Sequence, residues 1–255
     1  MGFKCGIVGL PNVGKSTLFN ALTASKNAEA ANFPFCTIDP NIGIVDVVDE
    51  RLDKLTKLSN SKKKIYTNIT FVDIAGLVKG ASKGEGLGNK FLSHIREVDA
   101  IIHLVRCFES DKITHVNSKI NPVEDLETIK TEIILSDLDI IQKKLEKGKK
   151  KLLQEKEIKI LEEKLNQLNE GKEITIKDDF EKEFLSSLGL LSVKPKIIVC
   201  NVDEENLAGG NAFTESVRKT YSNEKIVTIC ADIEDQIMGL DNSERETFMK
   251  EIGLN

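Results

Sequence analysis

The chain has 255 residues, of which 40% are hydrophobic and 30% are charged, so it can bury a sizeable core and is not a wholly disordered chain. Its net charge of −5 argues against nucleic-acid binding by the chain as a whole, and an aromatic content of 5%, with no Trp, disfavours an aromatic-rich all-β architecture. The sequence has neither an apolar run of the roughly 18 to 20 residues that span a membrane nor a signal-peptide pattern, and its five scattered cysteines indicate neither a disulfide framework nor a zinc cluster. We therefore expect a soluble, cytoplasmic protein with no membrane partner.

Short apolar runs rich in Val and Ile alternate with helical stretches over most of the chain. This alternation predicts an α/β fold with a largely parallel central sheet. Helices are expected at 15–23 and 88–98. Strands are expected at 3–8, 42–48, 69–74, 100–107, 196–200 and 226–230.

Residues 123–190 break this alternation. Apolar residues recur every three or four positions at 134–145 and again at 158–168, as they do on the buried faces of two helices. The segment Lys147-Gly148-Lys149-Lys150 is interpreted as the turn between them. We therefore expect an antiparallel helical hairpin inserted into the α/β domain, whose two parts are 1–122 and 191–255.

The end of this hairpin is basic. Residues 143–159 hold eight Lys and three Glu, a net charge of +5, so the tip could contact RNA phosphates. Charged helix faces are usually only solvated, and a structural or partner-docking hairpin is the alternative.

The segment Gly9-Leu10-Pro11-Asn12-Val13-Gly14-Lys15-Ser16 fits the phosphate-loop pattern G-x-x-x-x-G-K-[ST], between an expected strand and an expected helix. In such a loop, backbone N–H groups at a helix N-terminus surround the phosphates, and glycines permit a close approach. Lys15 is expected to reach the β- and γ-phosphates, and the Ser16 hydroxyl to bind Mg²⁺. The flanking strand and helix disfavour a Gly-rich turn with an incidental Lys. The predicted nucleotide-binding residues of this loop are Asn12, Val13, Gly14, Lys15, Ser16 and Thr17.

Two further segments are expected to respond to the γ-phosphate. Asp73, at the end of an apolar strand, could hold the Mg²⁺ shell through water, and the N–H of Gly76 could bond the γ-phosphate. Thr37 lies between the phosphate loop and Asp73, where its hydroxyl could also ligate Mg²⁺; taken alone, it is an ordinary loop threonine. Leu77 stands where Ras-like enzymes have a water-orienting Gln, so intrinsic hydrolysis is expected to be slow or to borrow another group.

The strand at 196–200 leads into Asn201-Val202-Asp203-Glu204, where guanine-specific switches have Asn-Lys-x-Asp. Because Glu204 is one methylene longer than that Asp, the two-bond contact to guanine is compromised, and the site loses its discrimination against other bases. We expect ATP to be preferred over GTP, with Asn201 accepting from the adenine amine. The rival interpretations are a shifted Asp203 that takes up the guanine edge and a plain strand-to-loop turn. The predicted base-contacting residues are Asn201, Val202, Glu204, Cys230 and Ala231.

Together these motifs resemble the YchF group, the Obg-like ATPases of the translation-factor branch of the P-loop GTPases. The Asn-x-x-Glu variant and the Leu after Asp-x-x-Gly occur together, and the similarity covers essentially the whole chain. The resemblance implies a G-domain fold with an inserted helical hairpin, Mg²⁺-dependent hydrolysis of ATP, and association with ribosomes in translation or stress responses. The matching stretches are 2–23, 32–40, 71–92, 105–108 and 201–204.

The resemblance also implies roles for single residues. Asn12 matches a position that helps to bind K⁺ beside the phosphates in related proteins, so K⁺ activation is a hypothesis, with a loop-capping Asn as the alternative. His115 matches a loop histidine proposed as catalytic in the family, and its pKa range suits water activation; the alternative is an exposed His that never approaches the γ-phosphate. The predicted catalytic residues are Lys15, Gly76 and His115, and the predicted metal ligands are Ser16, Thr37 and Asp73. His94 and His103 are interpreted as structural.

Family members usually continue into a small C-terminal TGS domain, whereas this chain stops at Asn255. Either the gene product lacks that domain, or this sequence is part of a longer protein. The leading hypothesis is a slow ATP-hydrolysing switch; the alternatives are a GTP-hydrolysing switch and a nucleotide-sensing binding module with negligible hydrolysis. Leu77 favours the binding module, and the intact Mg²⁺ set disfavours it.

Overall fold

The computed structural model describes residues 2–23, 40–76, 87–110, 119–148 and 153–251. Within these ranges, six strands form one sheet in the order β2-β3-β1-β4-β5-β6. The strands are β1 (Phe3–Val8), β2 (Asn41–Val47), β3 (Thr67–Asp73), β4 (Ala100–Arg106), β5 (Lys196–Asn201) and β6 (Ile226–Ile229).

The sheet is parallel except at one edge. The pairs β1–β3, β1–β4, β4–β5 and β5–β6 are parallel, whereas β2 pairs with β3 in the antiparallel sense. All six predicted strands are therefore present, and the largely parallel α/β sheet is confirmed. Because parallel strands end on the same side, β1, β3, β4 and β5 bring the loops that follow them to one edge of the sheet.

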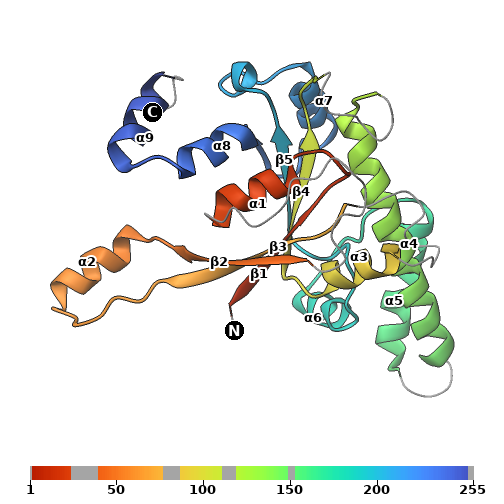
Figure 1. Cartoon of the computed structure of the whole chain (residues 1–255). Coiled ribbons are helices and arrows are strands. Elements are labelled where there is room, and N and C mark those ends of the chain that lie inside the picture. The colour runs from red at the N-terminus through yellow and green to blue at the C-terminus, as the bar shows by residue number, and fades with distance from the viewer. Residues whose placement is uncertain (1, 24–39, 77–86, 111–118, 149–152, 252–255) are drawn as a thin grey trace.

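Helices cover both faces of the sheet, and α1 packs against α8 (Figure 1). The main core cluster lies between the sheet and its helices, and it includes Ile7, Ile74, Ile95 and Leu104, all with no exposed surface. Burying a side chain of this size contributes about 1.5–3 kcal/mol. The helices are α1 (Lys15–Thr23), α2 (Glu50–Leu58), α3 (Leu87–Arg96), α4 (Pro122–Gly148), α5 (Glu155–Asn169), α6 (Asp179–Ser187), the short 3₁₀ helix η2 (Glu204–Asn206), α7 (Ala212–Thr220), α8 (Ala231–Met238) and α9 (Asn242–Glu251).

The helical insertion has its own core. Helices α4 and α5 lie side by side (Figure 1), and Ile141, Leu161 and Leu168 are buried between α4, α5 and α6. Lys164 is fully buried there and forms an ion pair of 2.9 Å with Glu181 of α6, which keeps its charge compensated.

The structure differs from the prediction for this region in two ways. The turn predicted at 147–150 is wrong in its first half, since α4 continues to Gly148; residues 149 and 150 lie outside the described ranges. A third helix, α6, follows the predicted pair, because Asp178 accepts a hydrogen bond from the Glu181 N–H and caps its start. The domain boundaries at 122/123 and 190/191 stay a prediction.

The strands β2 and β3 extend beyond the rest of the sheet, and α2 lies at their outer end (Figure 1). Asp49 caps α2 by accepting the Arg51 N–H, yet no residue of α2 is buried. None of the described helices is long and apolar enough to cross a membrane.

Candidate functional site

Lys15 is held inside the loop that joins β1 to α1. Its ammonium Nζ donates a hydrogen bond of 3.0 Å to the carbonyl oxygen of Leu10, and the side chain is only 8% exposed. Burial lowers the pKa of Lys15 to about 8, against the opposite effect of Asp73. A buried ammonium with a neutral carbonyl partner is stabilised by an incoming anion, so the loop suits a phosphate ligand.

The glycines of this loop are required by its geometry. A Cβ on Gly9 would lie 2.5 Å from the carbonyl oxygen of Leu104 in β4. Gly14 has φ = +97°, and its Cβ would lie 2.5 Å from Asn201 Nδ2. Asn12 is also left-handed, with φ = +63°, which Asn tolerates better than most residues. The chain therefore reaches α1 through a left-handed backbone conformation at Asn12 and Gly14.

Ser16 and Asp73 meet across the same edge of the sheet. The register between β1 and β3 places Asp73 opposite Ile7, just before the phosphate loop. Ser16 Oγ donates a hydrogen bond of 3.0 Å to Asp73 Oδ2. Burial raises the pKa of Asp73, whereas Lys15, Ser16 and the Asn41 side chain lower it. A hydroxyl and a carboxylate oxygen side by side are hard oxygen donors, which fits Mg²⁺.

Gly76 follows β3 and lies over the phosphate loop. A Cβ at this position would lie 3.0 Å from the backbone nitrogen of Pro11 and 3.1 Å from Lys15 Nζ. The backbone of Gly76 is thus close to the ammonium that is expected to hold the γ-phosphate, and a side chain here would crowd it.

Asn201, at the end of β5, is hydrogen-bonded both to the phosphate loop and to the start of α8. Its Nδ2 donates 3.0 Å to the carbonyl oxygen of Val13, and its Oδ1 accepts 2.9 Å from the N–H of Ala231. Both groups of the amide are therefore used within the protein, and the side chain is buried. Asn201 positions the phosphate loop against the start of α8, and the Ala231 N–H expected near the base is bonded to Asn201 here.

The residues after Asn201 separate into buried and exposed positions. Val202 is buried in an apolar cluster with Val105 and Val217. Asp203 caps η2 by accepting from the Asn206 N–H at 3.1 Å, so its carboxylate already has a partner. Glu204 is exposed at the start of η2. Its carboxylate acts electrostatically on the buried Cys230 thiol, whose pKa is raised chiefly by burial. Glu204 and the start of α8 are thus neighbours.

The structure brings together most of the predicted site. The phosphate loop, Asp73, Gly76, Asn201 and Ala231 are linked by the contacts above, whereas Thr37 and His115 lie outside the described residues. Two contributors were not predicted. The Leu10 carbonyl is a backbone group, so no residue type identifies it in the sequence. The position of Asn41 opposite Asp73 depends on the β2–β3 register, which the sequence does not give.

Comparisons with known proteins identify the family and the fold. The model of a family described as "50S ribosome-binding GTPase" matches residues 4–231. The chain is 47% identical to the "Ribosome-binding ATPase YchF" of Bacillus subtilis (strain 168) and 49% identical to that of Escherichia coli O157:H7; each alignment covers 100% of this chain and 72% of the relative. A solved structure, "Structure of the Schizosaccharomyces pombe YchF GTPase", is 34% identical with a TM-score of 0.80, over 100% of this chain and 72% of that one.

Proposed function

Because this chain belongs to the YchF family of P-loop nucleotide-binding proteins, we propose that it binds ATP with Mg²⁺, hydrolyses it slowly and acts as a nucleotide-dependent switch at the ribosome. The observation that carries the proposal is the linked set at one sheet edge: a buried ammonium in the phosphate loop, a serine bonded to an aspartate, and an asparagine tied to the loop.

The phosphates would be bound by the loop amides and by Lys15. Ser16 and Asp73 would hold Mg²⁺, with Thr37 as a further ligand, and the Gly76 N–H would bond the γ-phosphate. Bound Mg²⁺ would neutralise charge on the phosphate oxygens. Catalysis would then rest on positioning and electrostatic stabilisation, as phosphoryl transfer requires.

The base preference would follow from the loop after β5. In this chain Glu204 is exposed and Asp203 is occupied as the cap of η2, which supports a pocket that does not demand the 2-amino group of guanine. We therefore propose ATP over GTP. The solved relative from Schizosaccharomyces pombe is titled a GTPase, so GTP hydrolysis is the second candidate.

Slow turnover would follow from Leu77, which has no group to orient water. His115 could supply a base, and K⁺ bound through Asn12 could supply positive charge beside the phosphates. Equal hydrolysis rates in K⁺ and Na⁺ buffers would remove the K⁺ hypothesis.

A side-by-side titration of the purified chain with ATP and GTP tests the base preference. Tighter ATP binding is expected. Selective capture of GDP that adenosine nucleotides cannot displace would make the chain a guanine-dependent switch instead.

Single-turnover hydrolysis of labelled ATP tests the enzymatic proposal, with Lys15→Ala as the control. Product above that control is expected. Binding without product would leave a nucleotide-sensing binding module.

The proposed partner is the ribosome, because the relatives are named ribosome-binding ATPases, and the proposed location is the cytoplasm. Co-sedimentation with ribosomes, compared between a non-hydrolysable ATP analogue and ADP, tests it. Nucleotide-dependent co-sedimentation is expected, and equal recovery with both ligands would contradict a switch.

A further inference from the structure

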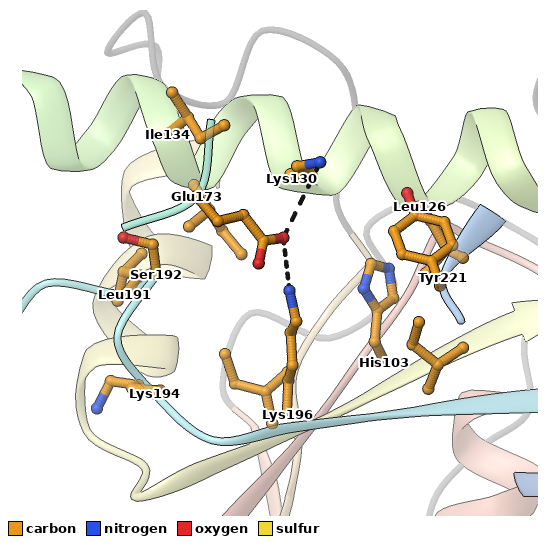
Figure 2. Close-up of a pocket in the computed structure, with 13 residues that line it drawn as sticks. His103, Leu126, Lys130, Ile134, Glu173, Leu191, Ser192, Lys194, Lys196 and Tyr221 are labelled. Atoms are coloured by element: carbon orange, nitrogen blue, oxygen red, sulfur yellow. Dashed lines mark hydrogen bonds and ion pairs between the residues drawn. The ribbon is translucent and has the colours of Figure 1, made fainter. Parts of the chain in front are cut away.

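A second hollow lies apart from the phosphate loop, between α4 and the face of the sheet formed by β4 and β5 (Figure 2). It has a volume of about 50 Å³. Six aliphatic residues line it together with seven polar or charged ones, and they come from the sheet, from α4, from the segment between α5 and β5, and from the end of α7. The aliphatic lining residues are Ile101, Leu126, Ile133, Ile134, Leu191 and Ile198.

His103, in the middle of β4, points into this cavity between Lys196 and Tyr221 (Figure 2). The side chain is only 7% exposed, and its Nε2 has no hydrogen-bond partner among the described residues. Burial, together with nearby Lys196, lowers the pKa of His103 to about 3, so the imidazole is neutral. A buried polar atom without a partner costs about 1–3 kcal/mol. Among the described lining residues, His103 Nε2 is therefore a buried side-chain atom that lacks a hydrogen-bond partner.

The charged groups at the cavity, in contrast, are paired. Lys196 Nζ lies 2.6 Å from Glu173 Oε1 and 3.1 Å from Glu224 Oε1. Lys130 lies 3.3 Å from Glu127 and 4.0 Å from Glu173, as the dashed line in Figure 2 marks for the second pair.

The other polar lining groups also have protein partners. Lys194 donates to the carbonyl oxygens of Arg96 and Val98. Ser192 Oγ donates to Asp137, and the Tyr221 hydroxyl donates to Glu127. A charged ligand would therefore lose its hydration without gaining an unpaired counter-ion.

Water alone matches this cavity poorly. The volume has room for roughly three to five water molecules at about 10–15 Å³ each, and each buried water needs two to four polar partners. The polar groups of the lining are already bonded within the protein, apart from the buried His103 Nε2, and the rest of the wall is aliphatic, so several waters together would find few strong partners. A molecule with a short aliphatic chain and one polar group would satisfy both the wall and the nitrogen.

We propose that this cavity is a binding site for a small uncharged aliphatic molecule bearing one hydroxyl group, such as a short-chain alcohol, with His103 Nε2 as its hydrogen-bond partner. A hydroxyl both donates and accepts, so it matches either tautomer of the neutral imidazole. The aliphatic part packs on the isoleucine and leucine walls.

The test is a titration of the full chain with butan-1-ol, followed by the NMR signals of the histidine side chains. We expect a saturable change at the His103 nitrogen and ring-proton signals, with a Kd on the order of 1 mM because so small a ligand has few contacts. Butyrate, of similar length but charged, is expected to bind at least about 10-fold more weakly. His94, on α3, lies outside the cavity lining and reports nonspecific effects of the alcohol.

His103→Leu removes the hydrogen-bonding group and is expected to weaken butan-1-ol binding about 10-fold, whereas the matched change His94→Leu leaves binding unchanged. If His103→Leu does not fold, Ile133→Phe fills the cavity and is expected to abolish the saturable change. No saturable change in the native chain, equal binding of butyrate, unchanged binding in a folded His103→Leu, or unchanged binding in Ile133→Phe would overturn the proposal.

Discussion

Asn201 Nδ2 donates a hydrogen bond of 3.0 Å to the carbonyl oxygen of Val13, 188 residues earlier in the chain. The same side chain accepts the N–H of Ala231 through Oδ1, at 2.9 Å. One amide thus connects the phosphate loop, the end of β5 and the start of α8. The loop that is expected to bind phosphate and the loop that is expected to bind the base are therefore both hydrogen-bonded to one buried side chain.

Asn201→Ala should destabilise the chain and weaken nucleotide binding. It leaves the Val13 carbonyl and the Ala231 N–H without their partner, which costs about 2–4 kcal/mol in the free energy of unfolding. ATP affinity is expected to fall by about 10- to 100-fold. Asn201→Asp keeps an acceptor for Ala231 but removes the donor to Val13, so it should also weaken binding. Chemical denaturation and calorimetric titration measure both; unchanged ATP affinity in both variants would contradict the role of this amide.

Gly14→Ala should be more harmful than Gly171→Ala. Both glycines have positive φ, +97° and +70°, but a Cβ on Gly14 would meet Asn201 Nδ2 at 2.5 Å, whereas one on Gly171 would meet nothing within 4 Å. Each variant loses about 1–2 kcal/mol from the left-handed backbone. Gly14→Ala should lose at least about 1 kcal/mol more and bind ATP at least about 10-fold more weakly. Equal unfolding free energies and equal ATP affinities would show that the contact with Asn201 has no effect.

Lys15→Met should stabilise the nucleotide-free chain while it abolishes phosphate binding. The unfolded chain keeps this proton up to its ordinary pKa of 10.5, whereas the folded chain loses it near 8, so the unfolded state binds more protons between these values. Stability of the native chain therefore rises with pH from about 8 to 10.5, and the full penalty, up to about 3 kcal/mol, is present below pH 8.

The gain in Lys15→Met should accordingly be largest at pH 7 and shrink as the pH approaches 10.5. Denaturation curves at several pH values, without nucleotide, measure it. Lys143→Met, at an exposed position on α4, is the control and should change stability by less than about 0.5 kcal/mol. A Lys15→Met variant less stable than the native chain at pH 7 would contradict the buried-charge argument.

Glu204→Asp should shift the base preference toward guanine. Shortening this carboxylate by one methylene restores the length found in guanine-specific switches, and the GTP-to-ATP affinity ratio is expected to rise by about 10-fold or more. Glu205→Asp, at the next exposed position of η2, is the matched control and should leave the ratio unchanged. Titrations with both nucleotides measure the ratio, and an identical response of the two variants would remove Glu204 from base selection.

Much of the fold could be predicted from the sequence. The predicted boundaries of β1 and α1 agree with the structure, because a buried apolar run and a phosphate-loop pattern fix them. Helix α2 was not predicted. It buries no residue against the core, and its leucines are interspersed with lysines, so its apolar pattern is weaker than that of a helix packed on the core. Helix α4 passes through Lys147 to Gly148, where lysines and glycine suggested a turn, since one glycine is tolerated near a helix end.

The site could be predicted where residue type alone determines the chemistry. Lys15, Ser16 and Asp73 are recognised by their motifs, and in the structure Ser16 bonds to Asp73 while Lys15 acts on Asp73 electrostatically. Val202 could not be placed in the same way, because only the packing of β5 against its neighbours shows that its side chain is buried in a core cluster. The capping of η2 by the Asp203 carboxylate likewise could not be predicted, because it depends on the conformation of the local turn.

The strand β5 begins at Lys196, whose ammonium is held by Glu173 from the helical insertion, and ends at Asn201, which fastens the phosphate loop. The six residues of β5 thus contact the helical insertion at one end and the phosphate loop at the other. A displacement of the helical insertion would therefore be expected to reach the phosphate loop through Lys196, β5 and Asn201.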